Sequence, residues 1–326
     1  MFADSPFILA IVISGIIAAV LMLALWLGLE RSIARRLVLG AIIPAVAVAV
    51  PAAIGLPETA RGGVGAALLM LVVGGVCGAI MDFSRLSERI SLGVAGVTLL
   101  LAAWLVLAAP VSGLAYHPGA VQIFAWAAFL IAGGCFLWVT RPDFTEDDAE
   151  DTKPAKGKKA KASKSRTTKA SGAGTSDDLS AYAKPGPVAV LMILALGQGI
   201  IADQFGLVDH VVFQAALTVA LVVALISEKT APQYRVTVWL GVVCALMASA
   251  ASAMIVAPAS CLAYAVLLLV VSGRQAAVRL STYLPPDNPA QAAVLGTFIR
   301  VGVLVLPLVI AALVAYIGAE MAAKAL

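Results

Sequence analysis

Charged residues are scarce in this chain. Of its 326 residues, only 12% are charged and 62% are hydrophobic, and the mean hydropathy is +1.02. A soluble domain with so much apolar surface would aggregate, whereas a lipid bilayer covers such a surface. The net charge of +4 gives no indication of nucleic-acid binding. The composition therefore predicts a multi-pass membrane protein surrounded by lipid.

Residues that commonly bind metals or take up protons are also few. All four cysteines fall within apolar spans, at Cys77, Cys135, Cys244 and Cys261. They lack metal-ligand spacing, so we expect them to pack as small side chains, and we expect no metal and no cofactor. No carboxylate is placed at the middle of a predicted span, which argues against a proton- or sodium-coupled carrier. Asp82 and Arg300 lie at span ends and are interpreted as interface anchors.

One polar stretch interrupts the apolar sequence, from Arg141 to Lys184. It begins with six acidic residues, continues with eight basic ones and ends in a Ser/Gly/Ala run. Such a composition cannot offset the entropy of ordering the chain, so we expect disorder from about Glu146 to Asp178. The predicted organisation is a first membrane half (1–140), a charged linker (141–185) and a second membrane half (186–326).

Apolar windows of about 20 residues are typical of transmembrane helices, whereas barrel strands alternate over about 10 residues. The predicted spans are 7–29, 37–56, 63–82, 90–109, 119–139, 187–205, 208–227, 236–256, 258–274 and 297–319. The fold class is therefore an all-α, polytopic transmembrane helical bundle of about ten spans in two five-helix halves. The breaks at Gly206 and Pro258 are the tightest. The first window is too long for a secretory signal and follows Asp4, so we interpret it as a span.

Lysine and arginine are concentrated in the loops after spans 1, 3, 5, 7 and 9, and the opposite loops contain only Arg61, with Lys324 near the C-terminus. The positive-inside rule then predicts a bacterial-type inner membrane protein with a cytoplasmic linker and both termini outside. The first half begins outside and the second half inside, so the halves, if related, are related by inversion. Inverted repeats are common in secondary transporters. The repeat is a hypothesis, because the two halves show no convincing alignment.

Glycine and proline modify several spans. Gly74 and Gly78 form a GxxxG step, and Gly93 and Gly96 offer a similar small-residue surface for close packing within one bundle or, alternatively, for a homo-oligomer. Proline frees a backbone carbonyl, and transporters use such broken helices to bind substrate. A buried glutamine amide also needs a partner. The candidate substrate path comprises Gln198, Gly197, Gly199, Pro44, Pro51 and Pro307. The alternatives are kinks that shape packing and a structural interhelical hydrogen bond.

Both histidines fall on the predicted outer face, together with two carboxylates. This candidate cluster comprises His117, Asp203, Asp209 and His210. Two imidazoles and two carboxylates would suit an acid/base pair or a metal site. The spacing carries no motif, however, and the alternative is polar loop residues near the lipid headgroups.

Basic residues on the predicted cytoplasmic side form a candidate docking set for anionic headgroups or a protein partner, namely Lys158, Lys159, Lys161, Arg274 and Arg279. The alternative is that their charge only fixes the topology. Asn288-Pro289 is a favourable helix start, and the helix is expected to run past Arg300 into span 10.

Three function hypotheses remain from the sequence. The first is a transporter or permease for an uncharged or amphipathic small molecule. The second is a non-catalytic membrane subunit that packs within a larger complex or a homo-oligomer. The third is an enzyme acting on a lipid-linked substrate at the outer face. The first two, neither of which is an enzyme, are favoured because mid-membrane polar chemistry is sparse.

Overall fold

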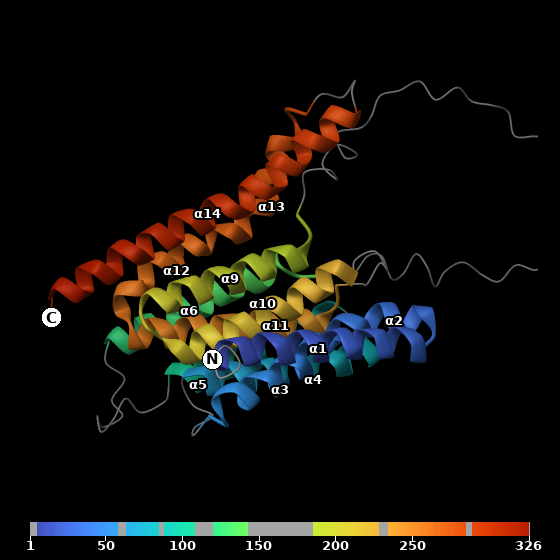
Figure 1. The fold of residues 1–326 in the computed structure, drawn as a ribbon, viewed down its shortest axis with the longest axis horizontal. Helices are drawn as coiled ribbons and strands as arrows, with labels where there is room; N and C mark the ends of the chain where they lie inside the picture. The colour runs from blue at the N-terminus through green and yellow to red at the C-terminus, as the bar shows by residue number, and fades with distance from the viewer. Residues whose placement is uncertain are drawn as a thin grey trace, which may run out of the picture.

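The computed structural model describes residues 5–57, 63–84, 88–107, 120–142, 185–227, 234–284 and 289–325. All regular secondary structure in these ranges is helical (Figure 1). The α-helices are α1 (Pro6–Gly28), α2 (Arg31–Leu37), α3 (Ile42–Ile54), α4 (Gly63–Ser84), α5 (Glu88–Leu107), α6 (Ala120–Val139), α9 (Pro187–Gln204), α10 (Val208–Ile226), α11 (Val236–Val256), α12 (Cys261–Leu267), α13 (Leu269–Ser281) and α14 (Pro289–Ala325). Short 3-10 turns at Val38–Ala41 and Pro258–Ser260 precede α3 and α12. The linker residues from 143 to 184, including those predicted to be disordered, lie outside the described ranges.

Each of the ten predicted spans is helical, the second and the ninth as consecutive shorter helices, which confirms the all-α membrane fold. Among the described residues, nine helical segments are long and apolar enough to cross a bilayer, and α6 adds the shorter apolar segment Trp126–Val139. The chain is thus a multi-pass integral membrane protein. The break at Gly206 is confirmed, with φ +68 between α9 and α10. The ninth span is longer than predicted, at Pro258–Ser281, because the backbone stays helical beyond the polar residues that end the apolar window.

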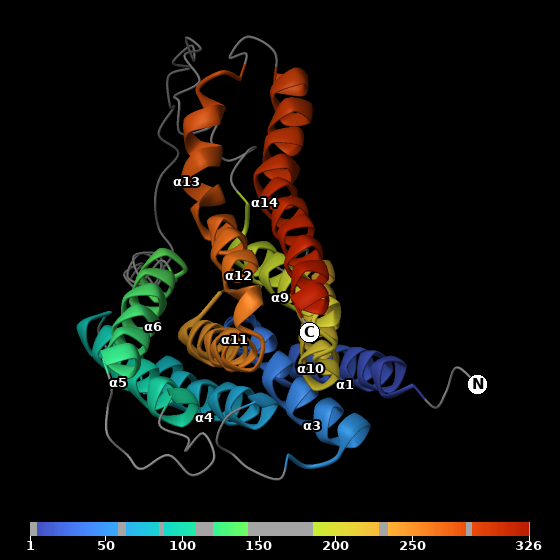
Figure 2. The ribbon, with the colours of Figure 1, turned by 90° about the vertical axis from the view of Figure 1, so that its left-hand side faces the viewer.

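Helix α11 is the central helix of the bundle. In its most apolar stretch 89% of residues are buried, against 17% in α14. It packs most extensively against α4, and Figure 2 looks nearly along it. A Cβ atom at Gly74 would lie 2.7 Å from the Leu240 carbonyl oxygen, and one at Gly78 would lie 2.5 Å from the Thr237 Cα. The predicted small-residue contact is therefore within the bundle, where glycine lets two backbones approach. Gly93 and Gly96 have nothing within 4 Å of such a Cβ, so they do not share this role.

Asp82 has a more specific role than an interface anchor. Its carboxylate accepts hydrogen bonds from the backbone N–H groups of Val236 (3.3 Å) and Thr237 (2.9 Å), and from the Thr237 hydroxyl (2.5 Å). These donors belong to the first turn of α11, where helix N–H groups lack intrahelical partners. Asp82 of α4 thus caps α11, and a side chain distant in sequence replaces the usual local cap.

Successive spans run in alternating directions (Figure 1). In consequence α2, the end of α6, the start of α9, the end of α13 and the start of α14 share one end of the bundle, and the end of α14 lies at the other. Which end faces the cytoplasm stays a prediction. Helix α4 packs against α11, and α3 against α10, which are the pairs that an inversion of five spans would relate. The inverted repeat itself also stays a prediction.

Candidate functional site

Four buried polar side chains form a cluster between α9, α10 and α11. The Gln214 amide nitrogen donates to the Gln198 carbonyl oxygen at 2.8 Å and to the Ser249 hydroxyl at 2.9 Å. The Nδ1 atom of His210 lies 3.1 Å from the same hydroxyl. All four side chains are buried. The cluster therefore links three helices through hydrogen bonds in an otherwise apolar interior, where such groups need partners.

The carbonyl oxygen of Gln214 is the exception in this cluster. Both N–H groups of the amide are used, whereas Oε1 is shielded from solvent and has no hydrogen-bond partner. One turn further along α10, the hydroxyl of Thr218 is likewise shielded and without a partner. An unpaired buried polar atom costs about 1–3 kcal/mol. A water molecule or ligand group that reached these oxygens would recover part of that cost.

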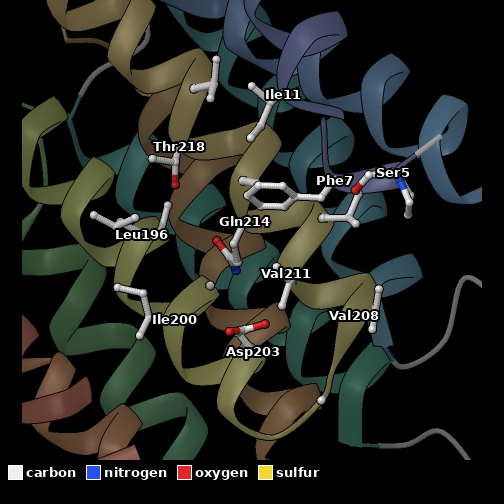
Figure 3. A pocket seen from close by; sticks show the side chains of 17 residues that line it. Ser5, Phe7, Ile11, Leu196, Ile200, Asp203, Val208, Val211, Gln214 and Thr218 are labelled. Atoms are coloured by element: carbon white, nitrogen blue, oxygen red, sulfur yellow. The ribbon is translucent and has the colours of Figure 1, made fainter. Parts of the chain in front are cut away.

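A groove of about 620 Å³, lined in part by Gln214 and Thr218, lies between α1, α9 and α10. Figure 3 shows Thr218, Gln214 and Asp203 following one another along it, with Phe7 and Ser5 on the opposite side. Its lining is mostly apolar and consists of Ser5, Pro6, Phe7, Ile11, Ala195, Leu196, Gly199, Ile200, Asp203, Gly206, Val208, Val211, Val212, Gln214, Ala215, Thr218 and Val219. We call this feature the α10 groove.

The α10 groove extends from one end of the bundle to about the middle of the membrane. Thr218 lies about 15 Å along α10 from Val208, at 1.5 Å per residue, which is half of a hydrocarbon core of about 30 Å. At that level α1 packs directly against α10. The Ser14 hydroxyl donates to the Ala216 carbonyl at 2.7 Å, and a Cβ at Gly15 would lie 3.1 Å from Val219. The groove thus lies between α1 and α9 on the surface of α10 and ends where α1 meets α10.

The structure places only some of the predicted substrate-path residues at or near the α10 groove. Gly199 lines the α10 groove, and Gln198 is one hydrogen bond away, behind Gln214. Gly197 faces away and packs against side chains of α12 and α14. Pro44, Pro51 and Pro307 are not among the groove residues; Pro44 is exposed, and the other two are partly buried within α3 and α14.

The structure also places the described residues of the predicted outer-face cluster in different environments. Asp203 is exposed and lines the groove, and Asp209 is also exposed. His210 is buried and pairs with Ser249, whereas His117 lies outside the described residues. No group of three potential metal ligands occurs among the residues that the structure describes.

Sequence reasoning missed Gln214 and Thr218. A signal was present, because Gln198 and Gln214 are amides in consecutive spans, and each needs a partner that the other supplies. Of the predicted docking residues, Arg274 and Arg279 lie on α13 at a separate cavity, and Lys158, Lys159 and Lys161 fall outside the described residues.

Comparison with known proteins adds no assignment. No family model matches the chain, and no curated protein or solved structure is significantly similar to it. The geometry of the α10 groove is therefore the basis for a function.

Proposed function

We propose that this membrane protein is a transporter or permease that binds an uncharged or amphipathic small molecule in the α10 groove. One observation carries the proposal: the α10 groove is lined by Gln214 and Thr218, whose side-chain oxygens are buried and lack protein partners. Binding sites near the bilayer midplane, between helices, are typical of secondary transporters.

The lining indicates the chemistry of the substrate. Most groove residues are apolar, and none of those described is basic, so an anionic substrate would gain no ion pair. Asp203 is the one charged side chain among them, and Gln214 lies between it and Thr218 (Figure 3). A neutral molecule with an apolar body and one hydroxyl or amide group fits best, because its N–H or O–H would donate to Gln214 Oε1.

Transport also requires a second state in which the groove opens toward the other surface. In the present state the contact of α1 with α10 at Ser14 and Gly15 closes that route. We therefore expect the substrate to favour a rearrangement in which α1 separates from α10 at this level.

Filling the groove provides the first test. Ala215→Trp places an indole in it, and Val97→Trp, on the exposed face of α5, is the matched control. A neutral probe such as 1-pyrenebutanol should bind to the wild-type protein and to the control, as measured by energy transfer from tryptophan, and not to Ala215→Trp. Compounds that bind should show counterflow in proteoliposomes. Unaltered binding and counterflow in Ala215→Trp would reject the groove as a substrate site.

Gln198 provides the second test. Gln198→Leu removes one interhelical hydrogen bond, typically about 0.6 kcal/mol in a membrane and at most about 2 kcal/mol. If the cluster only ties helices together, stability falls slightly and transport is intact. If it supports the substrate path, transport falls in a protein that remains folded. Tolerance of Gln198→Glu would further indicate water beside the groove, because an ionised carboxylate is costly in a dry interior.

A second candidate, a non-catalytic subunit of a larger complex, is favoured by α14. This helix is 37 residues long, or about 55 Å, and its outward side chains are large and apolar. A bilayer needs only about 20 residues, so part of this surface would suit a neighbouring membrane protein. Purification in mild detergent with mass measurement distinguishes the two, since a stoichiometric co-purifying protein supports the subunit.

A further inference from the structure

A second cavity lies between the end of α6 and the middle of α13. Its volume is about 460 Å³, and it is lined by Trp138, Val139, Arg274, Gln275, Val278 and Arg279. Both walls are held by the bundle. The Trp239 indole of α11 donates to the Leu137 carbonyl at 3.1 Å, beside Trp138. On the other wall, α13 packs against α14 at Gly273.

Positive charge surrounds this cavity. The guanidinium of Arg141 lies over the Trp138 ring, 4.3 Å from its centroid. Arg274 is partly buried and Arg279 is exposed, and none of the described lining residues is acidic. Guanidinium groups match the geometry of phosphate oxygens, and an aromatic wall supports such groups by cation–π contact. The cavity is therefore suited to a phosphate-bearing anion.

The depth of the cavity matches that of lipid headgroups. From Pro258 to Gly273 the ninth span covers about 24 Å at 1.5 Å per residue, somewhat less than a hydrocarbon core of about 30 Å. Arg274 follows directly. Helix α6 has 20 residues, about 30 Å, and Trp138 is near its end, at the level where indoles commonly settle. Two helices thus place the cavity independently at the boundary between hydrocarbon and headgroups.

We propose that this cavity binds the headgroup of an anionic phospholipid, with its phosphate toward Arg274 and Arg279. Toward the membrane interior, α6 exposes Ile131 two turns from Trp138 on the same helix face, and acyl chains would lie along this surface. A soluble phosphate would meet the same arginines but would gain nothing from this apolar surface. The site is separate from the α10 groove and does not depend on its function.

Lipid titration of the purified full chain in mild detergent tests the proposal. Phosphatidylglycerol and phosphatidylcholine with identical acyl chains are compared by thermal unfolding, with glycerol 3-phosphate as the soluble probe. Phosphatidylglycerol should stabilise the protein most. Removal of each arginine should weaken its binding about fivefold, and Arg274→Gln with Arg279→Gln about thirtyfold, if each cation contributes about 1 kcal/mol. Arg89→Gln, which removes an exposed arginine at the same end of the bundle, is the matched control.

Three results would overturn the proposal. One is equal stabilisation by the two lipids, and another is an equal loss of binding in Arg89→Gln. The third is stabilisation by glycerol 3-phosphate as strong as that by phosphatidylglycerol, which would indicate a soluble-anion site. Arg279 is exposed, so Arg279→Gln alone decides the outcome if the Arg274 variant does not fold.

Discussion

The Thr218 hydroxyl separates a structural role from a ligand-binding role more cleanly than any other group in the α10 groove. It is shielded and has no hydrogen-bond partner in the protein. Valine has the same shape but replaces the hydroxyl with a methyl group. Thr218→Val therefore removes a buried, unpaired polar atom whose burial costs about 1–3 kcal/mol. Allowing for local relaxation, we expect the free energy of unfolding to rise by about 1 kcal/mol.

The matched control is Thr98→Val on α5. Thr98 is also buried, but its hydroxyl donates to the Val94 carbonyl at 2.8 Å. Losing this bond, which lies within one helix, should lower the free energy of unfolding by about 0.5 kcal/mol. Both variants are measured by thermal unfolding in detergent, with and without a compound that binds in the α10 groove. Thr218→Val should reduce the affinity for a ligand that pairs with the hydroxyl about fivefold, corresponding to about 1 kcal/mol, and Thr98→Val should not.

Either of two results would refute this reasoning. If Thr218→Val lowers stability as much as Thr98→Val does, the hydroxyl must have a partner in the folded protein. If stability rises while the affinity of every groove ligand is unchanged, the hydroxyl does not contact the ligand, and the substrate chemistry proposed above is wrong at this position.

Three further predictions concern the scaffold. Gly74→Ala should lower stability by about 1–3 kcal/mol in thermal unfolding, because its Cβ would lie 2.7 Å from the Leu240 carbonyl oxygen. Gly93→Ala is the control and should not lower stability, because a Cβ there meets open space. Equal effects would contradict the close packing of α4 on α11. Asp82→Asn should cost about 1 kcal/mol through weaker capping of α11, and unchanged stability would show that the cap is dispensable. Burial raises the pKa of the Tyr234 phenol above its usual value near 10, so the unfolded phenol ionises first. The free energy of unfolding should therefore fall as the pH rises above about 10, and Tyr234→Phe should remove this part of the pH dependence in denaturant titrations.

The membrane class and the spans follow from the sequence alone. Apolar windows indicate which segments lie in the bilayer. Those segments must be helical, because each unpaired backbone group costs several kcal/mol in hydrocarbon. The start of α14 at Pro289 and the break at Gly206 were also predictable, since they depend on local conformational preferences of proline and glycine.

Contacts between distant helices were decided by the tertiary structure. Gly74 and Gly93 stand in similar apolar sequence, yet only Gly74 meets another backbone. From the sequence, Asp82 was interpreted as an interface anchor, whereas in the structure it accepts a hydrogen bond from the Thr237 N–H at the start of α11. Likewise, Gln198 was recognised as a buried amide, but its partner Gln214 is specified by the packing of α9 on α10. Hydropathy is nearly uniform around these helices, so it does not indicate which helix faces meet. The faces are selected by shape complementarity and by hydrogen bonds between helices, and both depend on the tertiary structure.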